Sequence, residues 1–222
     1  KRGGIIEPAQ RRNGRIVKLA AVGCGGEARE LLVGKLAQKR AHDRHGALLV
    51  ANHASNWDPL VLATALPMDY RLRVMGKEEL FRNPILAWVI RVGGAFPVNR
   101  GGADIQAVKT AIQTIQSGHN LLIFPEGTTI RNGIGKADGL PAHAHSGAAV
   151  IGVRTGAILV PVFVDGEKRT FHRTRIIIGQ PYTPVYTGRR GTAEEMQKIA
   201  DELLREVYAL GGQQVGGAPL CK

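Results

Sequence analysis

The sequence predicts an α/β fold with a largely parallel or mixed central sheet flanked by helices. From Ala47 onward, short apolar strand patterns alternate with helical patterns, which is typical of βαβ units. Hydrophobic residues make up 44% of the 222 residues and charged residues 22%, enough apolar material for a buried core and too much for a disordered chain. At this length, a single α/β domain is more common than two.

The first half of this pattern has short apolar runs for strands and longer runs at helical spacing for helices. In chain order it gives a strand at 47–51, a helix at 59–66, a strand at 71–75, a helix at 84–92 and a strand at 95–98. A helix at 104–117 follows. It has one apolar face and Gly118 as its stop signal, the face being Ile105, Val108, Ile112 and Ile115.

The second half continues with a strand at 121–124, a helix at 147–155, a strand at 158–164 and a strand at 175–178. Pro161 interrupts the apolar run 158–164, so we expect it at an edge position, at a bulge or near a ligand. The last helix begins at Thr192, where Glu195 completes a capping box. Its apolar face consists of Met196, Ile199, Leu203, Val207 and Leu210.

The segments outside this pattern differ in composition. Residues 1–46 are rich in Gly, Lys and Arg, and their apolar positions recur at roughly helical spacing: Ile16, Leu19 and Val22, then Leu31, Leu32 and Leu36. We therefore expect a basic helical arm at 1–46, an α/β domain at 47–210 and a flexible, Gly-rich tail at 211–222.

The chain is strongly basic, with 30 Lys and Arg against 18 Asp and Glu and a net charge of +12. This charge suits nucleic acid, an anionic membrane surface or a polyanionic substrate. Nucleic acid is disfavoured because aromatic residues make up only 5% of the chain, without an RNA-binding signature or a helix-turn-helix pattern. No apolar run is long enough to span a membrane. Cys24 and Cys221 give neither a disulfide framework nor a metal spacing, which fits a reducing compartment.

The strand at 47–51 leads directly into the sequence NHASNWD, residues 52–58. The carboxyl ends of parallel strands are where open α/β sheets place their sites. A carboxylate such as Asp58 can orient the imidazole of His53, which can then act as a general base toward a hydroxyl. The alternative is that Asp58 is an ordinary helix N-cap before Pro59.

Three further strand ends carry residues of interest. Lys77 follows the strand at 71–75, Arg100 the strand at 95–98, and Glu126-Gly127 the strand at 121–124. Arginine and lysine bind phosphate, and a Glu-Gly turn exposes a carboxylate beside a closely approachable backbone. Taken singly, each also reads as a solvated side chain or an ordinary turn. Together, a parallel sheet would gather them along one edge.

In this order, the blocks resemble the glycerolipid acyltransferase family, of the lysophosphatidic acid acyltransferase type. The blocks are NHASNWD, which has the family's HX4D pattern, then GAFPVNR at 94–100, FPEGT at 124–128 and VPV at 160–162. Lys77 opens a Lys-x-Glu-Leu-Phe block that also matches. The resemblance covers about residues 47–165.

The resemblance implies an O-acyltransferase of the 1-acylglycerol-3-phosphate type. It would transfer an acyl group from acyl-CoA or acyl-carrier protein to a lysophosphatidic acid, giving phosphatidic acid in phospholipid biosynthesis, with no cofactor. His53 would be the base and Asp58 its orienting partner. The expected acceptor site consists of Lys77, Arg100, Glu126, Gly127, Thr128 and Arg131, with Glu126 accepting from a glycerol hydroxyl.

Some positions depart from the family pattern. Thr129 stands where an arginine is usual, leaving Arg131 as the second basic position, and His145 stands where a lysine is common. The segment 126–147 is also longer than usual, so the acceptor could be another lysolipid or glycerol phosphate. His143 and His145 lack a nearby Cys or Asp set, so no metal site is expected.

Two other function classes compete with acyl transfer. A hydrolase could use the same His/Asp pair, but no Gly-x-Ser-x-Gly nucleophile elbow is present. A non-catalytic domain that binds anionic lipid is the second alternative. In either lipid-related case the charge predicts a peripheral or monotopic protein on the cytoplasmic face of the membrane, in contact through segment 15–40 or 80–92.

Overall fold

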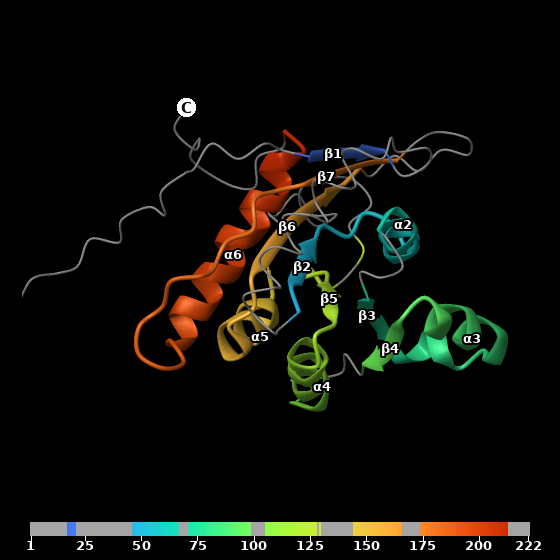
Figure 1. The fold of residues 1–222 in the computed structure, drawn as a ribbon, viewed down its shortest axis with the longest axis horizontal. Helices are drawn as coiled ribbons and strands as arrows, with labels where there is room; N and C mark the ends of the chain where they lie inside the picture. The colour runs from blue at the N-terminus through green and yellow to red at the C-terminus, as the bar shows by residue number, and fades with distance from the viewer. Residues whose placement is uncertain are drawn as a thin grey trace, which may run out of the picture.

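The computed structural model describes residues 17–20, 46–66, 71–98, 105–127, 129, 144–165 and 174–212. They contain a seven-stranded sheet with the strand order β1-β7-β6-β2-β5-β3-β4, and helices lie on both of its faces (Figure 1). The strands are β1 (Val17–Ala20), β2 (Leu48–Ala51), β3 (Leu72–Lys77), β4 (Ala95–Val98), β5 (Asn120–Ile123), β6 (Leu159–Val164) and β7 (Arg175–Ile178).

The helices are α2 (Asp58–Ala65), α3 (Pro84–Val92), α4 (Ile105–Gln116), α5 (Gly147–Thr155) and α6 (Ala193–Leu210), with a 3-10 turn η2 at Glu78–Phe81. From residue 47 onward, the predicted strands and helices are therefore confirmed, with ends shifted by no more than two residues. The predicted capping box of the last helix is also present: Thr192 accepts from the Glu195 N–H, and the Glu195 side chain accepts from the Thr192 N–H.

The sheet is mixed, as expected. Strands β6, β2, β5, β3 and β4 are parallel neighbours, whereas β7 pairs antiparallel with β6 and β1 antiparallel with β7. Because β2 lies between β5 and β6, the carboxyl end of this first strand of the parallel set is in the middle of the sheet. Open α/β sheets bind their ligands at the carboxyl ends of their parallel strands.

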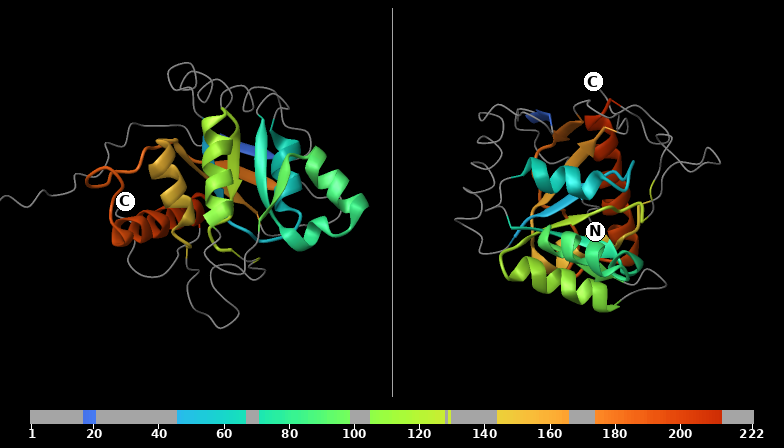
Figure 2. Two further views of the ribbon diagram at one scale, coloured as in Figure 1. Left: turned by 90° about the horizontal axis from the view of Figure 1, so that it is seen from below. Right: turned by 90° about the vertical axis from the view of Figure 1, so that its right-hand side faces the viewer.

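The sheet separates two hydrophobic cores, because successive side chains of a strand point to opposite faces. In β2, Leu48 and Val50 join the core with α4, α5 and α6, whereas Leu49 and Ala51 join the core with α2. Figure 2 shows α4, α5 and α6 in a row along their face of the sheet. The helix α6 thus packs directly on the strands whose ends carry the site.

The helical prediction for the N-terminal arm is wrong at the only part the structure describes. Val17–Ala20 is a strand that pairs with β7, Val17 opposite Ile178 and Ala20 opposite Arg175. Without β1, β7 would present an open edge of unpaired backbone groups, and a short apolar segment satisfies that edge. The rest of 1–45, and the tail beyond residue 212, lie outside the described residues.

Pro161 is not at an edge, because β6 lies between β2 and β7. The ladder between β6 and β7 covers residues 162–164, and just beyond it the Gly179 N–H donates to the Pro161 carbonyl at 2.8 Å. Leu159, two residues before Pro161, exchanges both backbone hydrogen bonds with Tyr182. One residue of β6 and two of the facing segment therefore lie between these paired positions, which is the bulge expected at Pro161. A Cβ on Gly179 would come within 2.7 Å of the Pro161 ring, so the chain needs glycine there.

Candidate active site

The loops that follow β2 and β5 lie side by side in the structure. In the parallel ladder, Leu48 pairs with Leu121 and Val50 with Ile123, a constant offset of 73 residues. The same offset persists beyond the strands. The His53 N–H donates to Glu126 Oε2 at 2.7 Å, and the Thr129 hydroxyl donates to Asn56 Oδ1 at 3.0 Å. The register of two buried strands thus sets which residues of the two loops meet.

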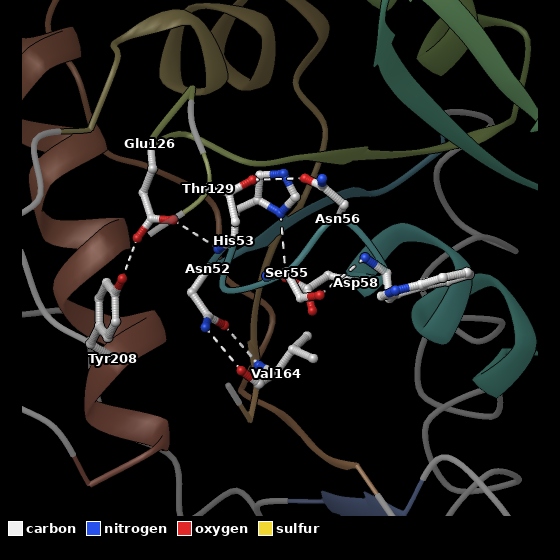
Figure 3. A network of polar contacts seen from close by, with 10 residues as sticks. Asn52, His53, Ser55, Asn56, Asp58, Glu126, Thr129, Val164 and Tyr208 are labelled. Carbon is white, nitrogen blue, oxygen red and sulfur yellow. Dashed lines mark hydrogen bonds and ion pairs between the residues drawn. The ribbon is translucent and has the colours of Figure 1, made fainter. Parts of the chain in front are cut away.

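Asn52 fixes the start of the first loop. Its side chain forms two hydrogen bonds with the backbone of Val164: Nδ2 donates to the carbonyl at 2.9 Å, and Oδ1 accepts from the N–H at 2.7 Å (Figure 3). An amide side chain can reproduce the donor and acceptor of a strand residue. Asn52, which is 3% exposed, therefore ties the end of β2 to the end of β6.

His53 and Asp58 form the predicted pair. His53 Nδ1 lies 3.3 Å from Asp58 Oδ2, and both residues are buried. Asp58 is the first residue of α2, whose N-cap is Trp57, so the alternative of an ordinary N-cap carboxylate does not apply. Its Oδ2 also accepts from the Ser55 N–H at 2.7 Å. The Asp58 carboxylate therefore stabilises the loop through the Ser55 backbone and at the same time faces the His53 imidazole.

The imidazole of His53 is also held by a ring. Phe124, the residue directly after β5, stacks on it with a centroid distance of 4.3 Å and an interplanar angle of 26°. With a proton on Nδ1 directed at Asp58, Nε2 keeps a lone pair that can accept a proton. This geometry would allow His53 to act as a general base with Asp58 as its orienting carboxylate.

Glu126 is buried, 5% exposed, and both of its oxygens hold protein donors. Oε2 accepts from the His53 N–H and Oε1 accepts from the Tyr208 hydroxyl (Figure 3). Burial raises the pKa of the Glu126 carboxyl, while the hydrogen bonds from Tyr208 and His53 act in the opposite direction. The sequence predicts that Glu126 accepts a hydrogen bond from a glycerol hydroxyl. That hydroxyl would be a third donor to oxygens that already accept from His53 and Tyr208.

Gly127 makes the turn that brings Glu126 inward. Its φ is +66°, in the left-handed region that favours glycine. A Cβ there would come within 2.8 Å of the His145 ring, and the His145 N–H donates to the Pro125 carbonyl at 2.8 Å. His145 thus packs against the backbone of the FPEGT turn.

The structure brings together part of the predicted set. His53, Asp58, Glu126 and Gly127 meet at the carboxyl ends of β2 and β5. Lys77 is the last residue of β3 and its backbone pairs with Val98, which places it at the same edge of the sheet. The other predicted positions, Arg100, Thr128 and Arg131, lie outside the described residues, so their roles stay predictions.

Sequence reasoning did not assign roles to Asn52, Phe124 or Tyr208. Asn52 lies in the NHASNWD block and Phe124 in the FPEGT block, so their positions in these blocks could have indicated a role in the site. Tyr208 lies far from any block, between apolar residues of α6. Its only signal was a hydroxyl next to the apolar face of an amphipathic helix, which needs a partner once it is buried.

In the described ranges, no group of three or more His, Cys, Asp or Glu side chains is placed to hold a metal ion, and His143 lies outside these ranges. Likewise, no helix in the described part of the chain is both long and apolar enough to cross a membrane.

A family model and several known proteins are similar to this chain. The sequence model of the family described as Acyltransferase matches residues 34–165, more than half of the chain. A 1-acyl-sn-glycerol-3-phosphate acyltransferase of Streptococcus pneumoniae is 34% identical over 121 residues, covering 54% of this chain and 41% of that protein. A lyso-ornithine lipid O-acyltransferase of Pseudomonas aeruginosa is 33% identical over 87 residues, covering 39% of this chain and 32% of that protein.

The match to these curated relatives spans less than half of their length. A solved structure covers more: the 1-acyl-sn-glycerophosphate (LPA) acyltransferase PlsC of Thermotoga maritima matches 86% of this chain and 84% of its own, with a TM-score of 0.53 and 23% identity. This likeness shows that the two proteins share a fold.

Proposed function

The chain belongs to the Acyltransferase family, and on this premise we propose that it transfers an acyl group from acyl-CoA or acyl-carrier protein to the free hydroxyl of a lysophosphatidic acid. The product would be phosphatidic acid, a precursor in phospholipid biosynthesis. The observation that supports this most is the buried His53–Asp58 pair, which is held at the end of the central strand β2 by Asn52 and Glu126.

The proposed reaction proceeds by direct transfer. His53 Nε2 removes the proton of the acceptor hydroxyl while its oxygen attacks the thioester carbonyl carbon. Asp58 stabilises the imidazolium that forms. The tetrahedral intermediate then expels the thiolate, the C–S bond breaks, and the imidazolium returns the proton to sulfur. No acyl-enzyme forms, and backbone N–H groups near the site stabilise the oxyanion.

Basic residues at the same edge of the sheet bind the acceptor's phosphate in this proposal. Lys77 ends β3 in the parallel part of the sheet, beside the strand that precedes the FPEGT turn. Arg100 follows β4 and Arg131 follows the turn, and their planar guanidinium groups suit a phosphate. Gly127 and Thr128 shape the acceptor site.

An assay of thiol release from acyl-CoA or acyl-carrier protein tests the proposal. We expect release that depends on added lysophosphatidic acid, with phosphatidic acid as the product. Release without an acceptor would indicate a thioester hydrolase. No release from either donor would indicate a non-catalytic lipid-binding domain.

A second candidate function is acylation of another lysolipid, and the position of Thr129 supports it. The family pattern has an arginine here, whereas the Thr129 hydroxyl donates to Asn56 and adds no charge. One relative is named for a lyso-ornithine lipid. A panel of lysophosphatidic acid, glycerol phosphate and lyso-ornithine lipid discriminates the two functions, and Thr129→Arg should shift the preference toward the phosphate acceptors.

We place the protein at an anionic membrane surface, on the cytoplasmic side, and α3 is the contact that we favour. Ile85, Trp88 and Val92 lie on one face of this helix and are 75%, 68% and 69% exposed. Exposed Arg82 and Arg91 flank this face. Apolar and aromatic residues bordered by cations are typical of helices that lie in a membrane interface. Failure to co-sediment with phosphatidylglycerol vesicles at physiological salt would contradict this placement.

A further inference from the structure

Tyr208 is a buried polar group outside the region that the family model matches. It lies near the end of α6, is 3% exposed, and is surrounded by the core that α6 forms with the sheet. Phe163 of β6 packs edge-on against its ring with a centroid distance of 6.4 Å. The ring is thus fixed by packing, and its hydroxyl has a fixed direction.

That hydroxyl is directed at Glu126, as Figure 3 shows. It donates to Glu126 Oε1, while Oε2 of the same carboxylate accepts from the His53 N–H at 2.7 Å. These two hydrogen bonds connect three segments that are far apart in sequence: α6, the turn after β5, and the loop after β2. The second bond is made by the backbone of His53, whose imidazole faces Asp58.

We propose that Tyr208 is a positioning residue for acyl transfer: its hydroxyl orients the Glu126 carboxylate, which holds the His53 backbone so that the imidazole stays on Asp58. This inference rests on the proposed function of His53 as the base. Glu126 is then a support of the base, and α6, beyond the family match, is part of the catalytic apparatus.

The hydroxyl also affects the protonation of Glu126. The titratable groups that face Glu126 are Tyr208 from α6, His53 from the loop after β2 and Asp58 from α2. Burial raises the Glu126 pKa and the Tyr208 hydrogen bond lowers it, so removal of the hydroxyl moves this pKa further upward. A protonated carboxyl is a weaker acceptor for the His53 N–H. As the pH is lowered, the hydrogen bond from the His53 N–H to Glu126 should therefore weaken at a higher pH without the Tyr208 hydroxyl than in the wild type.

The test compares Tyr208→Phe with Tyr182→Phe in the full chain, using acyl-CoA and lysophosphatidic acid. Tyr182 is half-buried, and its pKa is raised by burial and then by Glu206 and Glu202 rather than by Glu126, so its variant is a matched loss of one hydroxyl. For Tyr208→Phe we expect kcat to fall about tenfold with the acceptor KM changed less than about twofold. Tyr182→Phe should retain the wild-type kcat.

The pH profile separates a positioning role from a merely structural one. In Tyr208→Phe, the acidic limb of kcat should move to higher pH, whereas a general loss of stability would lower kcat evenly. Glu126→Gln can still accept from His53 and contact Tyr208, so it should retain more activity than Glu126→Ala. In the Glu126→Ala background, Tyr208→Phe should have no further effect.

Amide hydrogen exchange of His53 gives a readout that does not require activity. Protection of this amide should fall in Tyr208→Phe and stay unchanged in Tyr182→Phe. An active wild type whose Tyr208→Phe variant keeps its kcat, pH profile and His53 protection would overturn the inference while leaving the proposed function intact. A wild type without acceptor-dependent thiol release would overturn the proposed function, and with it the catalytic role of Tyr208, even if His53 protection changed as expected.

Discussion

The loop at residues 52–58 and the helix α3 both follow parallel strands of the same mixed sheet, but their environments are opposite. The loop is bonded to β6 through Asn52 and to the turn after β5 through His53, and Asp58 is fully buried at its end. In contrast, α3 lies beyond the outer strand β4 and exposes Ile85, Trp88 and Val92 (Figure 1).

This difference separates two physical tasks. A general base must stay within a few tenths of an ångström of its working geometry, which requires hydrogen bonds from several elements in a buried place. An interface with a lipid surface needs exposed apolar area and flanking cations, and tolerates movement. We therefore expect substitutions in the loop to change kcat and substitutions in α3 to change membrane binding.

The largest expected effect is that of His53→Ala. Loss of the general base should reduce kcat about a thousandfold, and loss of a buried imidazole that stacks on Phe124 should also lower the free energy of unfolding, which denaturant unfolding measures. His119→Ala is the matched control, since His119 lies between α4 and β5 and contacts Ser117 instead of the site. Retention of full activity by His53→Ala would remove His53 from the role of base.

Asn52→Leu should have the next largest effect. The leucine has a similar size but cannot bond to Val164, so a buried N–H and a buried carbonyl lose their partners at a cost of about 1–3 kcal/mol each in the free energy of unfolding. The His53 backbone would also lose one of its two supports, and we expect kcat to fall roughly 10- to 100-fold. Denaturant unfolding and steady-state kinetics measure the two effects. An unchanged kcat would show that the β6 contact is only structural.

On the other side of the comparison, the double substitution Ile85→Ser and Trp88→Ser should weaken binding to anionic vesicles. Each apolar side chain removed from the lipid interface costs on the order of 1.5–3 kcal/mol, so the two together should weaken binding by at least about a hundredfold. Val185→Ser is the control, because Val185 is also 75% exposed but follows β7, which lies toward the other end of the strand order from β4. Equal losses in the two variants would contradict a specific role for α3.

The smallest expected effect is that of Thr192→Ala at the start of α6. It removes the hydroxyl that accepts from the Glu195 N–H and should lower the free energy of unfolding by about 1 kcal/mol. Because Thr192 is at the opposite end of α6 from Tyr208, kcat should not change. Thermal unfolding should be compared with that of Thr183→Ala, a loss of the same hydroxyl at an exposed position before the helix. A fall in kcat would mean that α6 transmits strain from its first turn to the site.

The sequence was sufficient for most of the secondary structure, because apolar periodicity and capping are local properties. Thr192 and Glu195 predicted the start of α6 within one residue. It failed at Val17–Ala20, where helical spacing over a few apolar positions was outweighed by the need of β7 for a partner. For Pro161 it allowed an edge, a bulge or a nearby ligand, and only the pairing of residues 175–182 with β6 shows that the bulge applies.

By itself, the sequence determined the order of the elements, the excess of positive charge and the motif blocks that carry His53, Asp58 and Glu126. Only the tertiary structure decided how these residues meet. The register of β2 and β5 aligns His53 with Glu126, the packing of α6 brings Tyr208 to the same carboxylate, and β6 supplies Val164 to Asn52. Local patterns encode helices and strands, but contacts between residues 73, 82 or 112 positions apart depend on how the sheet and its helices pack.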